Sequence, residues 1–287
     1  MKWNSPWSVG FPGWHLECSA MSTKYLGERF DIHGGGNDLK FPHHENEIAQ
    51  NIGACGNAPA NYWLHTNMLL LNGKKMSKSD GNNITPMELI TGNSPHVSKG
   101  YSPMTVRFFT LQSHYSSQLD LTDEALAAAE KGFRRLMEAN KTLQSFVGSK
   151  ESPKPLDSEI DELINSAFIE MADDFNAPKA LAKLFELATI INKLNDKHLS
   201  LDDVSDDCIN RLKKCFSDFI FDIFGLSDES NNDGSGVVDG LMQLILDIRA
   251  DARTNKDWFT SDKIRNALSD LKILVKDSKE GSSWVKE

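Results

Sequence analysis

The sequence predicts an α/β segment followed by an all-α region and a small α+β module at the C-terminal end. Residues 1–56 are rich in glycine, proline, histidine and tryptophan and show no sustained helical period. From Thr122 onward, apolar residues recur at steps of three and four, which is typical of amphipathic helices. Residues 228–236 are polar and contain glycine, which indicates a linker before the last module.

Length and composition are those of a globular protein with two or three domains. The chain has 287 residues, of which 39% are hydrophobic and 25% are charged. No apolar run approaches the roughly 18–20 residues that span a bilayer, and no N-terminal segment resembles a secretion signal. The four cysteines are sparse and irregularly spaced, which argues against a disulfide framework and favours a cytoplasmic protein. The formal net charge of −10 argues against non-specific binding of nucleic acid, although a local basic stripe could still bind RNA.

Short alternating elements are predicted for the first 121 residues. Residues 29–33 are strand-like and lead into a glycine run, and a helix is expected to begin near Pro42 because proline suits the first helical turn. Residues 62–71 are mostly apolar and predict a buried strand, which leads into a loop rich in lysine and serine. Residues 106–111 form another short element before a polar connection.

An antiparallel helical bundle is predicted for the region between residues 116 and 227. Thr122 is a suitable N-cap for the first helix, with Asp123 and Glu124 favourably placed against the helix dipole. The expected helices span about 122–147, 160–171, 178–194 and 201–224. Beyond the linker, the sequence predicts helices at about 237–252 and 261–271, then a small hairpin formed by 273–277 and 283–286.

Cys18, His43 and Glu47 are candidate metal ligands. His43 and Glu47 are four residues apart, so on a helix that starts at Pro42 their side chains share one face. A distant cysteine that joins such a pair supplies a thiolate beside an imidazole and a carboxylate, all of which bind Zn²⁺. From spacing alone, the alternative stays open that Cys18 is a buried small residue and His43 a surface histidine. Trp14, four residues before Cys18, would either line a small pocket or pack as an ordinary aromatic residue.

The loop at residues 75–82 has the residue types of a polyphosphate site. Lys75 and Lys78 alternate with the hydroxyl of Ser77 on a glycine-flanked turn. Such groups bind phosphates and neutralise the charge that develops as a phosphate leaves. An arbitrary run of lysine and serine is more often an ordinary solvated loop, but the string KMSKS in this one is a complete match to a known signature.

A second candidate nucleotide site follows a predicted strand. His33 precedes Gly34, Gly35 and Gly36, and Asp38 comes two residues after the last glycine. Glycines let a ligand approach the backbone closely, and a carboxylate can accept hydrogen bonds from ribose hydroxyls. Alone this pattern is weak evidence, since glycine runs more often only form turns.

Taken together, three strings near the N-terminal end resemble the signature region of cysteinyl-tRNA synthetases. They are GWHLECSAM at residues 13–21, FDIHGGGNDL at 30–39 and FPHHENEIAQ at 41–50. The KMSKS string at 75–79 is similar to the second signature of class I aminoacyl-tRNA synthetases in general. The string ADDFNAPKAL at 172–181 resembles the helical domain of the family, and the stretch 248–265 resembles its C-terminal anticodon-recognition module. The resemblance spans nearly the whole chain and preserves the order of the motifs.

This resemblance implies the C-terminal half of a Rossmann-like class I catalytic core, followed by the helical bundle and the α+β module. The expected domains are 1–115 with the zinc site and the KMSKS loop, 116–227 for the tRNA-binding bundle and 237–287 for the anticodon-recognition module. A complete synthetase begins with the other half of the core, which carries a His-x-Gly-His signature and a cysteine as fourth zinc ligand. Neither is found in these 287 residues, so the chain by itself is expected to lack adenylation activity.

The function that the resemblance implies is cysteine–tRNA ligation. Cysteine is activated with ATP and Mg²⁺ to cysteinyl-adenylate and is then transferred to tRNA(Cys). Cys18, His43 and Glu47 correspond to three ligands of one Zn²⁺ per chain, the substrate thiolate completes the coordination, and Trp14 lines the cysteine pocket. The family further implies a cytoplasmic location, no membrane association and a monomeric full-length form.

The resemblance also implies which residues bind ATP. Lys75, Ser77 and Lys78 would contact the phosphates, and both lysines would act in catalysis. The remaining ATP-binding residues belong to the glycine-containing string: His33, Gly34, Gly35, Gly36 and Asp38. The carboxylate in that string corresponds to the group that holds the adenosine ribose.

Two alternatives stay open. One is the related ligase that joins cysteine to an amino-sugar in thiol biosynthesis, which shares the zinc and ATP chemistry but should not need an anticodon module. The region from Arg249 to Arg265 and the terminal hairpin favour the tRNA-linked function. The other is a non-catalytic remnant that binds tRNA or a partner, which would have no physical need of the metal triad and the KMSKS loop.

Overall fold

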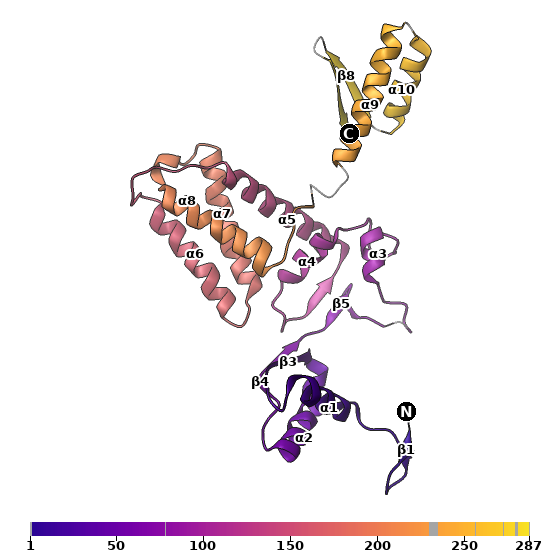
Figure 1. Ribbon diagram of the computed structural model, residues 1–287, viewed down its shortest axis with the longest axis vertical. Helices are drawn as coiled ribbons and strands as arrows, with labels where there is room; N and C mark the ends of the chain where they lie inside the picture. The colour runs from indigo at the N-terminus through magenta and orange to yellow at the C-terminus, as the bar shows by residue number, and fades with distance from the viewer. Residues whose placement is uncertain are drawn as a thin grey trace. The chain divides into compact units, whose positions relative to one another are not determined.

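The computed structural model describes residues 2–77, 79–229, 235–255, 257–271, 273–278 and 281–286. The chain divides into two units, residues 1–227 and 228–287 (Figure 1). Lys78 of the predicted ATP loop and residues 230–234 of the predicted linker lie outside the described residues. None of the helices within the described ranges combines the length and apolar character that crossing a membrane requires.

The N-terminal segment of the first unit is built around a parallel β-α-β arrangement (Figure 1). Its elements are, in order, β1 (Trp3–Asn4), β2 (Val9–Gly10), α1 (Trp14–Leu26), β3 (Phe30–Gly36), η1 (Asn37–Leu39), η2 (Lys40–His44), α2 (Glu45–Cys55) and β4 (Ala60–Thr66). Helix α2 connects β3 to β4, which pair in parallel with Ile32 opposite Tyr62 and His33 opposite Trp63. Helix α1 packs beside α2.

Helix α1 is absent from the sequence-based prediction, which expected no sustained helix before Pro42. The helix spans Trp14–Leu26, and every one of its side chains is at least partly exposed. Its apolar residues are spread around the axis, so no stripe at steps of three and four marks it in the sequence. The helix predicted to begin near Pro42 is confirmed, because α2 and the preceding turn η2 cover the region from Pro42 to Ala49.

The β3–β4 sheet is more exposed than the sequence predicts. Ile32 and Tyr62 are exposed, and in the part of the chain that the structure describes no third strand pairs with this sheet. The predicted buried strand at 62–71 is wrong, because β4 ends at Thr66 and the chain enters a different sheet at Leu69. An apolar run predicts burial only where further layers cover the strand, and parallel sheets usually have both faces covered.

A three-stranded sheet carries the hairpin that leads into the KMSKS loop. β5 (Leu69–Leu71) pairs antiparallel with β6 (Lys74–Lys75) and in parallel with β7 (Leu119–Leu121). The turn residues Asn72 and Gly73 both have positive φ, 53° and 75°. Two consecutive positive φ angles are what a type I′ hairpin requires, and the Asn-Gly pair is the sequence that adopts it most readily.

Two short helices lie between β6 and β7 along the chain. α3 (Pro86–Thr91) follows Thr85, and α4 (Pro103–Leu111) follows Ser102. Both capping side chains accept a hydrogen bond from a backbone N–H of the first turn, and both helices have proline at their start. The short element expected at 106–111 is therefore part of a helix.

Helices α5 to α8 share one apolar core, as the periodicity of the sequence predicts. They are α5 (Asp123–Gln144), α6 (Asp157–Ala172), α7 (Ala177–Asn195) and α8 (Asp206–Ser217), with the short turns η3 (Leu201–Asp203) and η4 (Asp218–Ile223). The predicted cap is confirmed, since the Thr122 side chain accepts a hydrogen bond from the Ala125 N–H. The predicted face is buried from Leu126 to Leu143, but α5 ends at Gln144 and Val147 is exposed.

The second unit consists of two helices and a hairpin. α9 (Ser235–Thr254) and α10 (Trp258–Asp270) pack together, and β8 (Ile273–Ser278) pairs antiparallel with β9 (Gly281–Lys286). The expected helices and the expected hairpin are therefore confirmed. Arg249, in the stretch that resembles an anticodon module, is buried in this unit, whereas Arg265 is exposed.

A matched pair of isoleucines on α6 tests how far the bundle depends on apolar burial. Ile160 is fully buried, whereas Ile169 is 66% exposed. Ile160→Ala is expected to lower the free energy of unfolding by about 2–5 kcal/mol, because it removes packed methyl groups and leaves a cavity. Ile169→Ala is expected to change it by no more than about 0.5 kcal/mol. Urea titration monitored by far-ultraviolet circular dichroism measures both, and equal losses would contradict the described packing.

Candidate metal centre and active site

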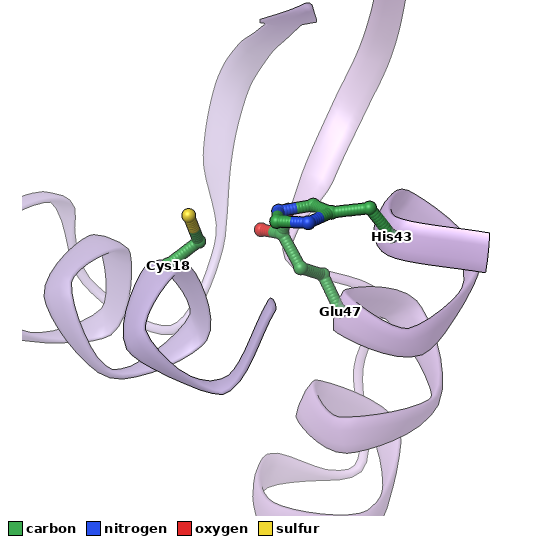
Figure 2. Close-up of side chains that lie close together, drawn as sticks. All are labelled: Cys18, His43 and Glu47. Atoms are coloured by element: carbon green, nitrogen blue, oxygen red, sulfur yellow. The ribbon is translucent and has the colours of Figure 1, made fainter. Parts of the chain in front are cut away.

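Three donor side chains from three different elements meet at one point. Cys18 lies on α1, His43 at the end of η2 and Glu47 in the first turn of α2, and the three point toward one another (Figure 2). The His43 Nε2 atom is 3.1 Å from Glu47 Oε1. The sulfur, nitrogen and carboxylate oxygen all lie within 4.8 Å of one another. The helical spacing of the last two residues and the packing of α1 beside α2 produce this cluster.

Burial makes this cluster electrostatically unusual. The Glu47 side chain is only 2% exposed, and its carboxylate contacts two imidazoles, with His33 Nε2 3.3 Å from Oε2. A buried carboxylate is costly unless positive charge and hydrogen bonds compensate it. The two histidines balance the negative charge of the Glu47 carboxylate only when they are protonated. A bound dication would balance that charge at any pH at which it binds.

The Cys18 thiol responds to the same environment. Burial raises its pKa, and the nearby carboxylates of Glu47 and Glu17 raise it further because they oppose a second negative charge. A dication between the sulfur and the carboxylate would reverse that effect. The donor set of one sulfur, one nitrogen and one oxygen suits Zn²⁺, and three protein donors leave a fourth tetrahedral position open. The residues therefore fit a zinc ion that can also bind a substrate.

Trp14 lies beside the imidazole of this cluster. The centroids of the Trp14 and His43 rings are 4.7 Å apart, with the planes inclined at 71°. The tryptophan stands one turn before Cys18 on α1 and is 60% exposed. It is thus an apolar wall at the surface of the cluster rather than a packed core residue.

Behind the cluster lie His44 and His65, which the sequence analysis did not single out, together with His33, which it assigned to the nucleotide site. His44 Nδ1 lies 2.9 Å from His65 Nε2, and the rings of His33 and His44 both contact Trp63. Burial lowers the pKa of His44 to about 4, and the neighbouring imidazoles contribute to the shift. His33, His44 and Glu47 form a second set of three potential ligands around the same carboxylate. The parallel register that sets His33 opposite Trp63 brings these residues together, and a single sequence does not reveal that register.

The glycine run has a packing role inside this segment. A Cβ atom on Gly35 would lie 2.7 Å from His44 Cε1, and one on Gly36 would collide with the carboxylate of Asp38. Gly34 has ordinary space for a side chain. Asp38 itself is exposed on η1, at the end of β3. Glycine is thus needed at Gly35, where the backbone passes close to the buried His44 ring, whereas at Gly36 the exposed Asp38 side chain could turn away.

The described part of the KMSKS loop is a closed hairpin. Ser77 and Asn82 exchange two backbone hydrogen bonds of 2.9 and 3.1 Å, and the Asn82 side chain donates to the Lys75 carbonyl at 3.1 Å. The hydroxyls of Ser77 and Ser79 lie 2.8 Å apart. Lys75 is exposed on β6, so its ammonium group is accessible to a ligand.

Two family models match the chain. The model of the class I (C) tRNA synthetase catalytic domain matches residues 1–131, and the DALR domain model matches residues 167–228. The first match contains the metal cluster and the KMSKS hairpin. The second begins within α6 and includes all of α7 and α8.

Curated relatives match the chain from end to end. The cysteine–tRNA ligase of Cytophaga hutchinsonii is 47% identical over 290 residues, covering 100% of this chain and 58% of the relative. The enzyme of Parabacteroides distasonis is 47% identical over 99% of this chain and 57% of its own length. That of Deinococcus radiodurans is 43% identical over 99% and 56%, respectively. The chain therefore spans somewhat more than half the length of the relatives that it matches.

A solved structure shares the fold. The crystal structure of the Agrobacterium radiobacter K84 agnB2 LeuRS–tRNA–LeuAMS ternary complex matches with a TM-score of 0.50 and 16% identity. The match covers 79% of this chain and 34% of that one. At this identity the likeness concerns the fold alone, which is that of a class I synthetase. The two family models and the end-to-end relatives show that the chain belongs to the cysteine–tRNA ligase family of class I tRNA synthetases.

Proposed function

We propose that the chain carries the cysteine site and the ATP loop of a cysteine–tRNA ligase. The observation that carries this proposal is the buried cluster of Cys18, His43 and Glu47, in a segment that matches the class I (C) catalytic domain. A thiolate, an imidazole and a carboxylate around an open fourth position suit a zinc ion that selects a thiol substrate. Trp14 covers one side of that position.

The need for a metal follows from the substrate. Cysteine differs from serine by one atom, and the shape of a pocket discriminates such pairs by only about 1–3 kcal/mol. When bound, Zn²⁺ would supply a soft Lewis acid that prefers a thiolate to a hydroxyl, which stays protonated near neutral pH. The His33 imidazole, whose Nε2 lies 3.3 Å from Glu47 Oε2, would hold that carboxylate in place as an outer-shell partner.

The proposed reaction has two steps. A carboxylate oxygen of cysteine attacks the α-phosphorus of ATP, with Mg²⁺ as counter-ion, and pyrophosphate leaves. A hydroxyl of the terminal ribose of tRNA(Cys) then attacks the carbonyl carbon of cysteinyl-adenylate, and AMP leaves. Lys75, Ser77 and Lys78 are proposed to bind the phosphates, while Asp38 holds the ribose and His33, Gly34, Gly35 and Gly36 line the nucleotide site. Positive charge placed where phosphate charge develops is a large source of rate.

The helical part and the C-terminal unit are proposed to bind tRNA. The match of residues 167–228 to the DALR domain and the names of the end-to-end relatives support this role and favour it over the amino-sugar ligase. In this proposal domain boundaries lie near residues 115 and 227, the complete protein is a monomer, and it acts in the cytoplasm without a membrane.

Metal content and thiol selectivity test the proposed site directly. The purified chain is expected to hold one equivalent of zinc and to bind cysteine but not serine, measured by atomic absorption and calorimetric titration. Cys18→Ser should weaken metal binding by more than the roughly 10- to 100-fold that the loss of an outer-shell partner costs. Cys55→Ser is the matched control, because this thiol is absent from the metal cluster among the described residues. Unchanged zinc content in Cys18→Ser would refute the ligand assignment.

The chain alone is expected to form no cysteinyl-adenylate. The described cluster offers three donors, which can bind zinc but leave its coordination open. The β3–β4 sheet leaves Ile32 and Tyr62 exposed, so adenylation is expected to need further polypeptide. Cysteine-dependent ATP–pyrophosphate exchange should therefore be at background level and should rise when the remainder of a relative is added in trans. Exchange by the 287-residue chain on its own would contradict this expectation.

Lys78→Ala tests the phosphate role of the loop within a complete ligase. Loss of a group that stabilises transition-state charge commonly costs about 10²- to 10³-fold in kcat. The adenylation rate should fall by that amount, while tRNA affinity stays near that of the parent. Lys99→Ala, which removes an exposed lysine paired with Glu130, serves as the control. A variant that binds tRNA more weakly but activates cysteine normally would overturn the assignment.

A further inference from the structure

The α1–α2 junction joins the thiol of the metal cluster to its imidazole and carboxylate. Cys18 lies on α1, whereas His43 and Glu47 precede and begin α2. Their mutual distances therefore depend on how these two helices are held together. We infer that Gln50 is a positioning residue that fixes α1 on α2 and so keeps Cys18 within reach of the metal, an inference that rests on the proposed function.

The junction is polar rather than apolar. Every side chain of α1 is at least partly exposed, and the buried side chains of α2 are those of Glu47 and Asn51. The Asn51 amide nitrogen donates to the carbonyls of Glu28 and Asn57, each at 2.8 Å, and neither of these residues belongs to α1. Hydrophobic burial between the two helices is therefore slight, and their register depends on a few hydrogen bonds.

Gln50 makes the central contacts of this junction. Its Oε1 accepts a hydrogen bond of 2.8 Å from Ser19 Oγ, and its Nε2 donates to His15 Nδ1 at 2.8 Å. Ser19 follows Cys18 directly and His15 precedes it by three residues, so the amide contacts α1 on both sides of the thiol. Gln50 lies three residues after Glu47, on the same side of α2.

The directions of these hydrogen bonds favour an amide at this position. The oxygen accepts from a hydroxyl and the nitrogen donates to an imidazole, so both ends of the side chain are used. With the Gln50 amide nitrogen as donor to His15 Nδ1, the proton of that imidazole lies on Nε2. One side chain thus links the turn that carries the thiol to the turn that carries the carboxylate.

A more distant contact between the same helices offers a control. Thr23 Oγ1 lies 3.4 Å from Asn51 Oδ1, and it is five residues beyond Cys18 along α1. This contact also joins the two helices but does not border the metal cluster. Removing it should affect the junction without moving the sulfur.

The test is metal binding by the purified full chain, with Co²⁺ as a spectroscopic probe. Gln50→Met keeps the length of the side chain and removes both hydrogen bonds. The dissociation constant for Zn²⁺, measured by competition with a chelating dye, should rise about 10- to 100-fold, as for other outer-shell partners. The thiolate-to-Co²⁺ charge-transfer band should weaken in parallel, while Thr23→Val retains the parental affinity and spectrum.

The outcomes separate this inference from the proposed function. Parental affinity and a parental Co²⁺ spectrum in folded Gln50→Met would overturn the positioning role alone. If Gln50→Met does not fold, Ser19→Ala, which removes one oxygen atom, carries the same expectation on a smaller scale. A parent chain that binds neither Zn²⁺ nor Co²⁺ through sulfur would overturn both the inference and the proposed metal site.

Discussion

The buried carboxylate of Glu47 is the constraint around which the N-terminal segment is arranged. Its charge lies in a nearly solvent-free position, and imidazoles from β3 and η2 and a thiol from α1 surround it. An isolated negative charge is not tolerated there, so the groups around it must supply hydrogen bonds and positive charge. This requirement accounts for the density of histidine in the segment and for the glycines that let the backbone pass closely beside them.

The two parts of the first unit are stabilised by different means. The bundle α5 to α8 buries a continuous apolar core, which needs only the correct pattern of hydrophobic residues. The metal segment has few buried apolar residues, and many of its large side chains, such as Trp7, Phe11 and Phe41, are exposed. Its helices α1 and α2 are joined by hydrogen bonds of Gln50 with Ser19 and His15, and by the Thr23–Asn51 contact. The segment therefore has little hydrophobic stabilisation, and polar contacts fix the positions of the metal-binding side chains.

This difference explains where sequence-based prediction succeeded. The first three helices of the bundle were predictable to within a few residues, because repeated burial of one face leaves a period of 3.6 in the sequence. The fourth predicted helix, about 201–224, is divided into η3, α8 and η4. Helix α1 left no such trace, since it contributes polar side chains to its neighbour and keeps its apolar ones partly exposed. The strand at 62–71 was assigned to one buried element because apolar composition cannot reveal that the chain changes sheets after Thr66.

The sequence by itself determined the chemical types of the site and their local spacing. The spacing of four residues predicted that His43 and Glu47 share a helical face, and the KMSKS string predicted a phosphate-binding loop. Only the tertiary structure decided that Cys18 reaches that face, that His33 and His44 surround the same carboxylate, and that Gln50 joins the two helices. The physical reason is distance along the chain. Contacts within one turn follow from backbone geometry, whereas contacts between α1, β3 and α2 depend on how separate elements pack.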